Sequence, residues 1–126
     1  MGFLERLMSS QSSGYEAWKQ LTEISQLDEI DKVSAQHSVV IFKHSTSCGI
    51  SAGAKHRLEM DWSEVKEEVE FYFLDLLSYR HISDHIVTRY KVRHQSPQIL
   101  VIKNGIATYN TSHHRINVGS ILEAVL

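Results

Sequence analysis

One stretch of the chain constrains the fold more than any other: Val39-Val40-Ile41-Phe42-Lys43-His44-Ser45-Thr46-Ser47-Cys48-Gly49-Ile50-Ser51. Its β-branched and aromatic first part, residues 39–43, predicts a strand that is buried on both faces. A helix is expected from Gly49 to about Asp61, with an apolar face formed by residues at spacings of four: Ile50, Ala54 and Leu58. Cys48 stands at the start of this helix, where unpaired backbone N–H groups and the helix dipole favour a thiolate over a thiol.

The rest of the chain alternates strands with helices. Strands are expected at 70–75, 98–102 and 106–110, and helices at 25–33, around 82–90 and from Asn117 or Val118 to Leu126. Residues 18–21 fit either a short first strand or a helical turn. Asn104-Gly105 predicts a type I′ turn that joins the last two strands. Because strands joined through helices pair in parallel, this order predicts a thioredoxin-like three-layer α/β/α fold with a central mixed sheet and a C-terminal hairpin plus helix.

Composition narrows the class of protein. With 126 residues, 42% of them hydrophobic, the chain suits a single globular domain over 15–126, preceded by a flexible lead-in over 1–14. Its one cysteine excludes an internal disulfide and fits a reducing cytoplasm. A formal net charge of −2 gives no electrostatic reason to expect a nucleic-acid partner. No apolar run approaches the roughly 20 residues that cross a bilayer, so we expect no membrane association.

Two further residues outline a site around the thiol. Ser51 comes three residues after Cys48, where a dithiol enzyme has its second cysteine. Pro97, the only proline, directly precedes the strand at 98–102, the position of the cis-proline in thioredoxin-like proteins. A cis bond there would expose the backbone of Ser96 to an extended thiol ligand, which can pair with it as a short added strand.

The segment from Phe42 to Ser51 resembles the signature of the monothiol bacilliredoxins of the bacillithiol system. The similarity extends from about Trp18 to the C-terminus and includes Ser96-Pro97-Gln98. The family's segment ends in Cys-Pro-Ile-Ser, which this chain matches at three positions: Cys48, Ile50 and Ser51. Gly49 takes the place of the family's proline. Since proline at the first helical position pre-organises a helix, Gly49 indicates a looser loop.

The resemblance implies thiol–disulfide exchange in which Cys48 removes bacillithiol from mixed disulfides on proteins. Bacillithiol or another low-molecular-weight thiol would be the co-substrate, with no bound cofactor. S-thiolated client proteins would be the partners of a monomer or weak homodimer active in redox homeostasis and the stress response. Without a second cysteine, the resolving thiol must come from outside the chain. Candidates for stabilising the thiolate are Lys43, His44, Thr46, Ser47 and Ser51, and candidates for contacting the thiol ligand are Gly49, Ser96 and Pro97.

Other functions stay open at this point. The chain also fits a non-catalytic thioredoxin-fold binding module, or a redox sensor that is capped once at Cys48, or an exchanger that uses a glutathione-type or coenzyme-A-type thiol. Iron–sulfur binding is disfavoured because the loop lacks the pattern of monothiol glutaredoxins. His81 and His85 have a spacing that can grip zinc, but no further ligands are evident, so we expect no metal. His113-His114 is either a contact for the malate part of bacillithiol or ordinary surface.

Overall fold

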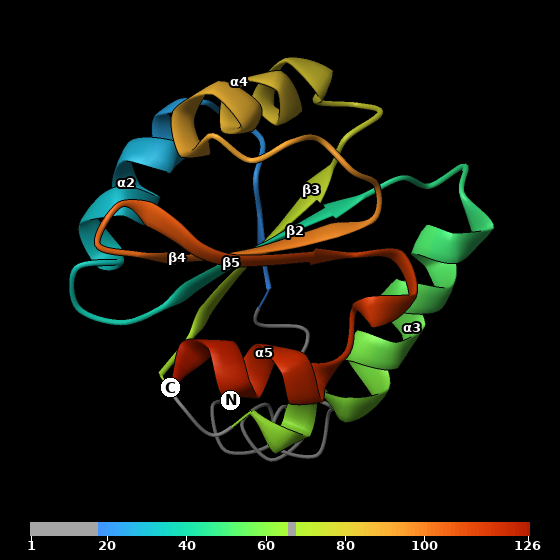
Figure 1. Cartoon of the computed structure of the whole chain (residues 1–126). Helices are drawn as coiled ribbons and strands as arrows, with labels where there is room; N and C mark the ends of the chain where they lie inside the picture. Colours follow the sequence, from blue (N-terminus) through green and yellow to red (C-terminus); the bar gives the residue numbers. More distant parts are fainter. Residues whose placement is uncertain (1–17, 66–67) are drawn as a thin grey trace, which may run out of the picture.

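The central feature is a five-stranded mixed sheet, seen here in a computed structural model that describes residues 18–65 and 68–126 (Figure 1). The lead-in predicted over residues 1–14 lies outside the described residues. The strands are ordered β1-β3-β2-β4-β5. Their bounds, in that order, are Lys19–Gln20, Glu70–Asp75, Val39–His44, Gln98–Lys103 and Ile106–Ser112. The first three pair in parallel and the last two join antiparallel, which confirms the predicted mixed sheet.

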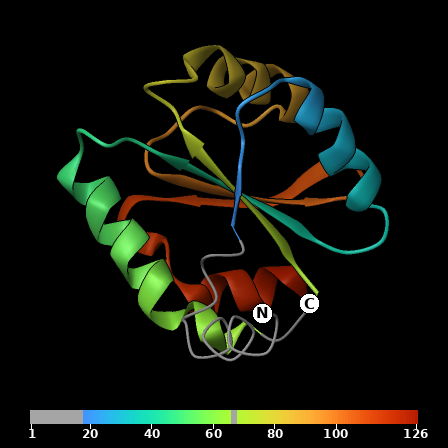
Figure 2. The same ribbon diagram turned by 180° about the vertical axis from the view of Figure 1, so that it is seen from behind.

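Helices cover both faces of the sheet, and Figures 1 and 2 show the three layers from opposite sides. On one face lie α2 (Ser25–Val33) and α4 (Arg80–Tyr90). On the other lie α3 (Gly49–Asp61) and α5 (Val118–Val125). Short 3-10 turns follow α3 and β5, at Trp62–Glu64 and His113–Arg115. The predicted thioredoxin-like α/β/α architecture is therefore confirmed.

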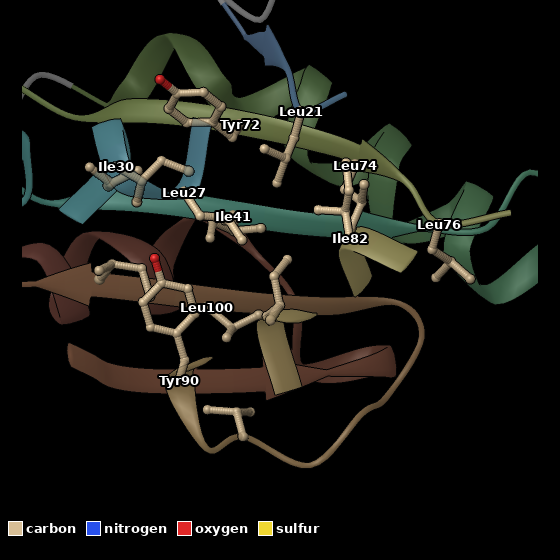
Figure 3. Close-up of a cluster of buried hydrophobic side chains, with 14 residues drawn as sticks. Leu21, Leu27, Ile30, Ile41, Tyr72, Leu74, Leu76, Ile82, Tyr90 and Leu100 are labelled. Carbon is tan, nitrogen blue, oxygen red and sulfur yellow. The ribbon is translucent and has the colours of Figure 1, made fainter. Parts of the chain in front are cut away.

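Strand β2 is buried along its whole length and separates two apolar clusters. Ile41 contributes to the first cluster, which α2 and α4 close and Figure 3 shows in detail. Phe42, the next residue, points to the opposite face and joins a second cluster with Ala54 and Leu58 of α3. Each fully buried side chain of this kind stabilises the fold by about 1.5–3 kcal/mol. The double burial explains why the run at 39–43 shows no polar alternation.

The sheet edges resolve one ambiguity of the sequence and confirm one of its predictions. Lys19–Gln20 is a strand, paired in parallel with β3 through Lys19 and Tyr72. At the other edge, Asn104 and Gly105 both have positive φ, 51° and 73°, as the predicted type I′ turn requires.

Within residues 18–65 and 68–126, no helix is long and apolar enough to span a bilayer.

Helix α3 departs from its predicted apolar face in its first turn. Ile50, which we expected to face the core, is 43% exposed. Ser51 is fully buried in its place, followed by Ala54 and Leu58. The first turn follows the end of β2, so its inward position meets the polar end of the strand and not the apolar cluster. Spacing alone could not predict this change of side-chain environment.

A candidate thiol site at the start of helix α3

Cys48 is the residue that caps the N-terminus of α3. Its backbone is extended, with φ −113° and ψ 120°. The Cys48 N–H donates to the carbonyl of Ser45 at 3.2 Å, and the N–H of Ala52 donates to the Cys48 carbonyl at 3.0 Å. The side chain is half-buried. A turn after β2 and the first turn of α3 therefore hold a partly accessible thiol in a defined place.

The hydroxyl of Ser51 ties this turn to strand β2. It accepts a hydrogen bond from the N–H of Ser45 at 3.0 Å and lies 2.6 Å from Nδ1 of His44. Burial lowers the pKa of His44, and the ammonium of Lys55 lowers it further. The tautomer of His44 decides whether its Nδ1 or the Ser51 hydroxyl donates. The predicted donation of the Ser51 hydroxyl to the Cys48 thiolate stays a prediction, as does the predicted role of His44.

The two other hydroxyls predicted to assist the thiol lie on the exposed loop before it. Thr46 and Ser47 are both exposed. The hydroxyl of Ser47 lies 3.2 Å from that of Ser45. Both residues are close to Cys48 along the chain, and their contribution to the thiolate stays a prediction.

Lys43 points to the opposite side of the sheet from His44. It alternates with Ile41 and shares the α2 and α4 face, because successive residues of a strand face opposite ways. Its side chain is fully buried, and Nζ has no hydrogen-bond partner among the described residues. Burial lowers the pKa of Lys43 to about 8, against an opposing effect of the Asp84 carboxylate. Any influence of Lys43 on Cys48 has to act from this other face and stays a prediction.

The Ser96–Pro97 peptide bond is cis, as the sequence predicted. Gln98, the first residue of β4, pairs with Lys43 near the end of β2. Pro97 therefore lies just beyond this pair, at the same end of the sheet as the Cys48 loop. The carbonyl of Pro97 accepts from the N–H of His113 at 3.1 Å. No backbone–backbone hydrogen bond within the described residues uses Ser96. Among the described residues its N–H and carbonyl therefore have no backbone partner, and the predicted role of Ser96 in ligand binding stays a prediction.

Gly49 occupies the first helical position of α3. No heavy atom lies within 4 Å of the place that a β-carbon would take, and its φ is not in the positive range. Neither space nor backbone conformation therefore demands glycine at this position.

A metal centre finds no support in residues 18–65 and 68–126. His81 and His85 lie one turn apart on α4. No group of three or more His, Cys, Asp or Glu residues that could hold a metal ion occurs in this described part of the chain.

Sequence reasoning missed Lys55 and Phe73, which both lie beside His44. The ring centroids of Phe73 and His44 are 5.3 Å apart, and Lys55 Nζ lies 5.8 Å from the centroid of Phe73. A signal for Lys55 exists in the sequence, because Ser51 and Lys55 are four residues apart and neighbours on a helix surface. No comparable signal identifies Phe73, which comes from another strand.

These features define a class of protein: a thioredoxin-fold protein with a single thiol at the start of a helix and a cis-proline at the same end of the sheet. A solved structure with a thioredoxin fold, assigned as an oxidoreductase, is 30% identical, with a TM-score of 0.75 and coverage of 86% of this chain and 94% of that one. The thioredoxin of Malassezia sympodialis is 18% identical (TM-score 0.65, coverage 86% and 87%). Spinach chloroplast thioredoxin f is 16% identical (TM-score 0.65, coverage 86% and 90%).

The family is more specific than the fold. Residues 19–121 match the family described as monothiol bacilliredoxin BrxC. The chain therefore belongs to the monothiol bacilliredoxin family, and its function lies in thiol redox chemistry.

Replacing the buried lysine should stabilise the protein. In Lys43→Met, we expect the free energy of unfolding at pH 7 to rise by about 2–3 kcal/mol, because a group whose pKa falls from 10.5 to about 8 on folding is costly while protonated. This cost is complete below pH 8 and disappears as the pH rises from about 8 to 10.5, so the gain should shrink over that window. Urea unfolding of both proteins at pH 7 and at pH 10 measures this gain in the free energy of unfolding. Lys32→Met, on the exposed side of α2, is the control. A Lys43→Met protein less stable than the parent at pH 7 would contradict this account.

Proline should be accepted at position 49. Gly49→Pro is expected to raise the free energy of unfolding by about 0.4–1 kcal/mol, because proline suits the first helical position and restricts the unfolded chain. The extended backbone of Cys48 is the conformation preferred before proline. Thermal or urea unfolding measures the change. Gly53→Pro, one turn later in the same helix, is the matched control and should destabilise by about 3 kcal/mol. Equal losses in both variants would show that the start of α3 rejects proline.

Proposed function

We propose that this protein removes bacillithiol from mixed disulfides on client proteins, with Cys48 as the nucleophile. The observation that carries the proposal is the half-buried thiol at the N-cap of α3 in a chain of the monothiol bacilliredoxin family. Helix N-termini favour anions, and a partly accessible thiolate is the reactive form of cysteine. Ser51 supports a one-thiol cycle, because the place of a second cysteine holds a buried hydroxyl.

In the first step, the Cys48 thiolate attacks the bacillithiol sulfur of the mixed disulfide. A new S–S bond forms between Cys48 and bacillithiol while the bond to the client breaks. The client leaves as a thiolate and takes a proton from solvent. No net oxidation occurs in this step, since one disulfide is exchanged for another.

In the second step, a free bacillithiol thiolate attacks the bacillithiol sulfur that caps Cys48. Bacillithiol disulfide forms, and Cys48 leaves as a thiolate. Across both steps the client disulfide is reduced, and two bacillithiol units end as one oxidised pair. The low-molecular-weight thiol is thus a co-substrate that supplies the electrons, and no bound cofactor takes part.

The cis-proline loop is proposed to align the disulfide for this attack. The unpaired backbone of Ser96 beside Pro97 offers an N–H and a carbonyl to an extended segment, in the manner of an added strand. Gly49 borders the thiol with open space around its α-carbon, which supports close approach of the ligand. S-thiolated proteins are the partners in this proposal, and a reducing cytoplasm is the compartment in which such a cycle runs.

Removing the thiol should abolish turnover. Cys48→Ala is expected to lose all release of bacillithiol from a bacillithiolated model protein above the rate measured without the protein, because no other thiol exists in the chain. Ser63→Ala, an exposed serine in the 3-10 turn that follows α3, is the control and should retain most of the activity. The reaction contains excess bacillithiol and a reductant that regenerates it from bacillithiol disulfide. Release is followed by mass spectrometry of the client. Activity in Cys48→Ala would refute the proposal, and a single modification of the wild type without turnover would favour a redox sensor.

A further inference from the structure

A groove of about 390 Å³ runs beside the thiol loop on the α3 side of the sheet. Its walls include Thr46, two residues before Cys48, and Ala52, whose N–H is bonded to the Cys48 carbonyl at 3.0 Å. From Ala52 it extends along α3 past Lys55 to Glu59, seven residues or about 10 Å of helix. The volume lies within the range of small-molecule sites. The groove therefore begins at the loop that carries the proposed nucleophile and leads away along α3.

One wall of the groove is an aromatic surface. Phe73 is half-buried; Gln20 of β1 pairs with it along the sheet, and the ring of Trp18 is stacked with its ring at 6.4 Å between centroids. Behind it, Phe73 packs edge to face against Phe42, with ring centroids 5.8 Å apart. The ring is thus held in place by the core while part of it faces the groove.

The lining from α3 is polar and carries both signs of charge. Lys55 and Glu59 form an ion pair four residues apart on α3, and Lys55 Nζ lies 5.8 Å from the centroid of Phe73. His56 is exposed beside them, and His44 contributes its imidazole to the groove. Together these side chains supply hydrogen-bond donors and acceptors beside an apolar ring.

An aromatic ring beside mixed donors and acceptors suits a sugar ring. The C–H groups of a sugar can pack on the phenyl ring of Phe73, while its hydroxyls can both donate to Glu59 and accept from Lys55. A linear peptide tail lacks a flat ring for Phe73, and a purely apolar ligand would leave the ion pair of α3 desolvated and unmatched.

We propose that this groove binds the sugar-containing tail of the low-molecular-weight thiol that acts at Cys48, with Phe73 against the sugar and Lys55 and Glu59 at its hydroxyls. The inference rests on the proposed function and deepens it by assigning the part of the molecule that selects the small thiol. Client proteins bind elsewhere, along the backbone of Ser96.

Steady-state kinetics test the groove through the thiol carried by the client, because its tail is the one held beside Cys48 when the mixed disulfide is attacked. In Phe73→Leu and Lys55→Gln we expect the KM for a bacillithiolated client to rise about five- to tenfold, the scale of one lost aromatic or polar contact, with kcat changed less than about twofold. The KM for the same client carrying a mixed disulfide with 2-mercaptoethanol, which has no tail, should not change. Lys103→Gln, at the opposite end of the sheet, is the charge-matched control. Because Phe73→Leu alters packing, Lys55→Gln, at a partly exposed position, provides the test if the former unfolds. An unchanged KM in Lys55→Gln and in folded Phe73→Leu would overturn the inference.

Direct binding separates the groove from the proposed function. Glucosaminyl malate, the thiol-free tail of bacillithiol, is titrated into Cys48→Ser protein and followed by amide NMR shifts. Saturable shifts at Thr46, Ala52 and Lys55 are expected. Shifts confined to the neighbouring cavity of about 400 Å³ at residues 110–115, or no shifts, would overturn the inference. Groove binding without release of bacillithiol from clients would refute the function alone, whereas release without groove binding would refute the groove alone.

Discussion

The buried hydrogen bonds of Ser51 connect the thiol turn to the sheet. One hydroxyl satisfies the N–H of Ser45 and Nδ1 of His44, so it joins the end of β2 to the first turn of α3. Leaving either buried partner without a hydrogen bond would cost on the order of 1–3 kcal/mol. Because Cys48 lies between the two joined segments, its position follows from this connection. The residue in the place of a resolving cysteine thus has a structural use.

Strand β2 keeps two polar environments apart within one fold. His44 faces α3 and belongs to the thiol side, where burial lowers the pKa of its imidazole. Lys43, its neighbour, faces α2 and α4 and lies buried without a hydrogen-bond partner in the described part of the chain. A buried ammonium with no direct partner opposes folding, so the apolar packing around β2 has to offset it. At the end of β2, one face therefore carries the hydrogen-bonded His44, and the other carries Lys43, whose ammonium has no hydrogen-bond partner among the described residues.

Much of the fold follows from the sequence, because the informative signals are local. The apolar runs of β2 and β4, the Asn104-Gly105 turn and the single proline each act over a few residues and predict their own geometry. The surroundings of the thiol depend instead on contacts between distant segments. The face taken by Lys43, the exposure of Ile50 and the approach of Phe73 are set by strand register and by where α3 begins relative to the sheet. No periodicity in a single segment encodes those relations.

The lone thiol also sets the kinetic order of any chemistry at this site. A dithiol protein resolves a mixed disulfide by ring closure, which benefits from the high effective molarity of an oriented neighbour. With a hydroxyl in that position, every disulfide at Cys48 is intermolecular and has no such advantage. Its lifetime is then inversely proportional to the concentration of free thiol around it. A chain built this way responds to the size of the surrounding thiol pool as well as to its redox state.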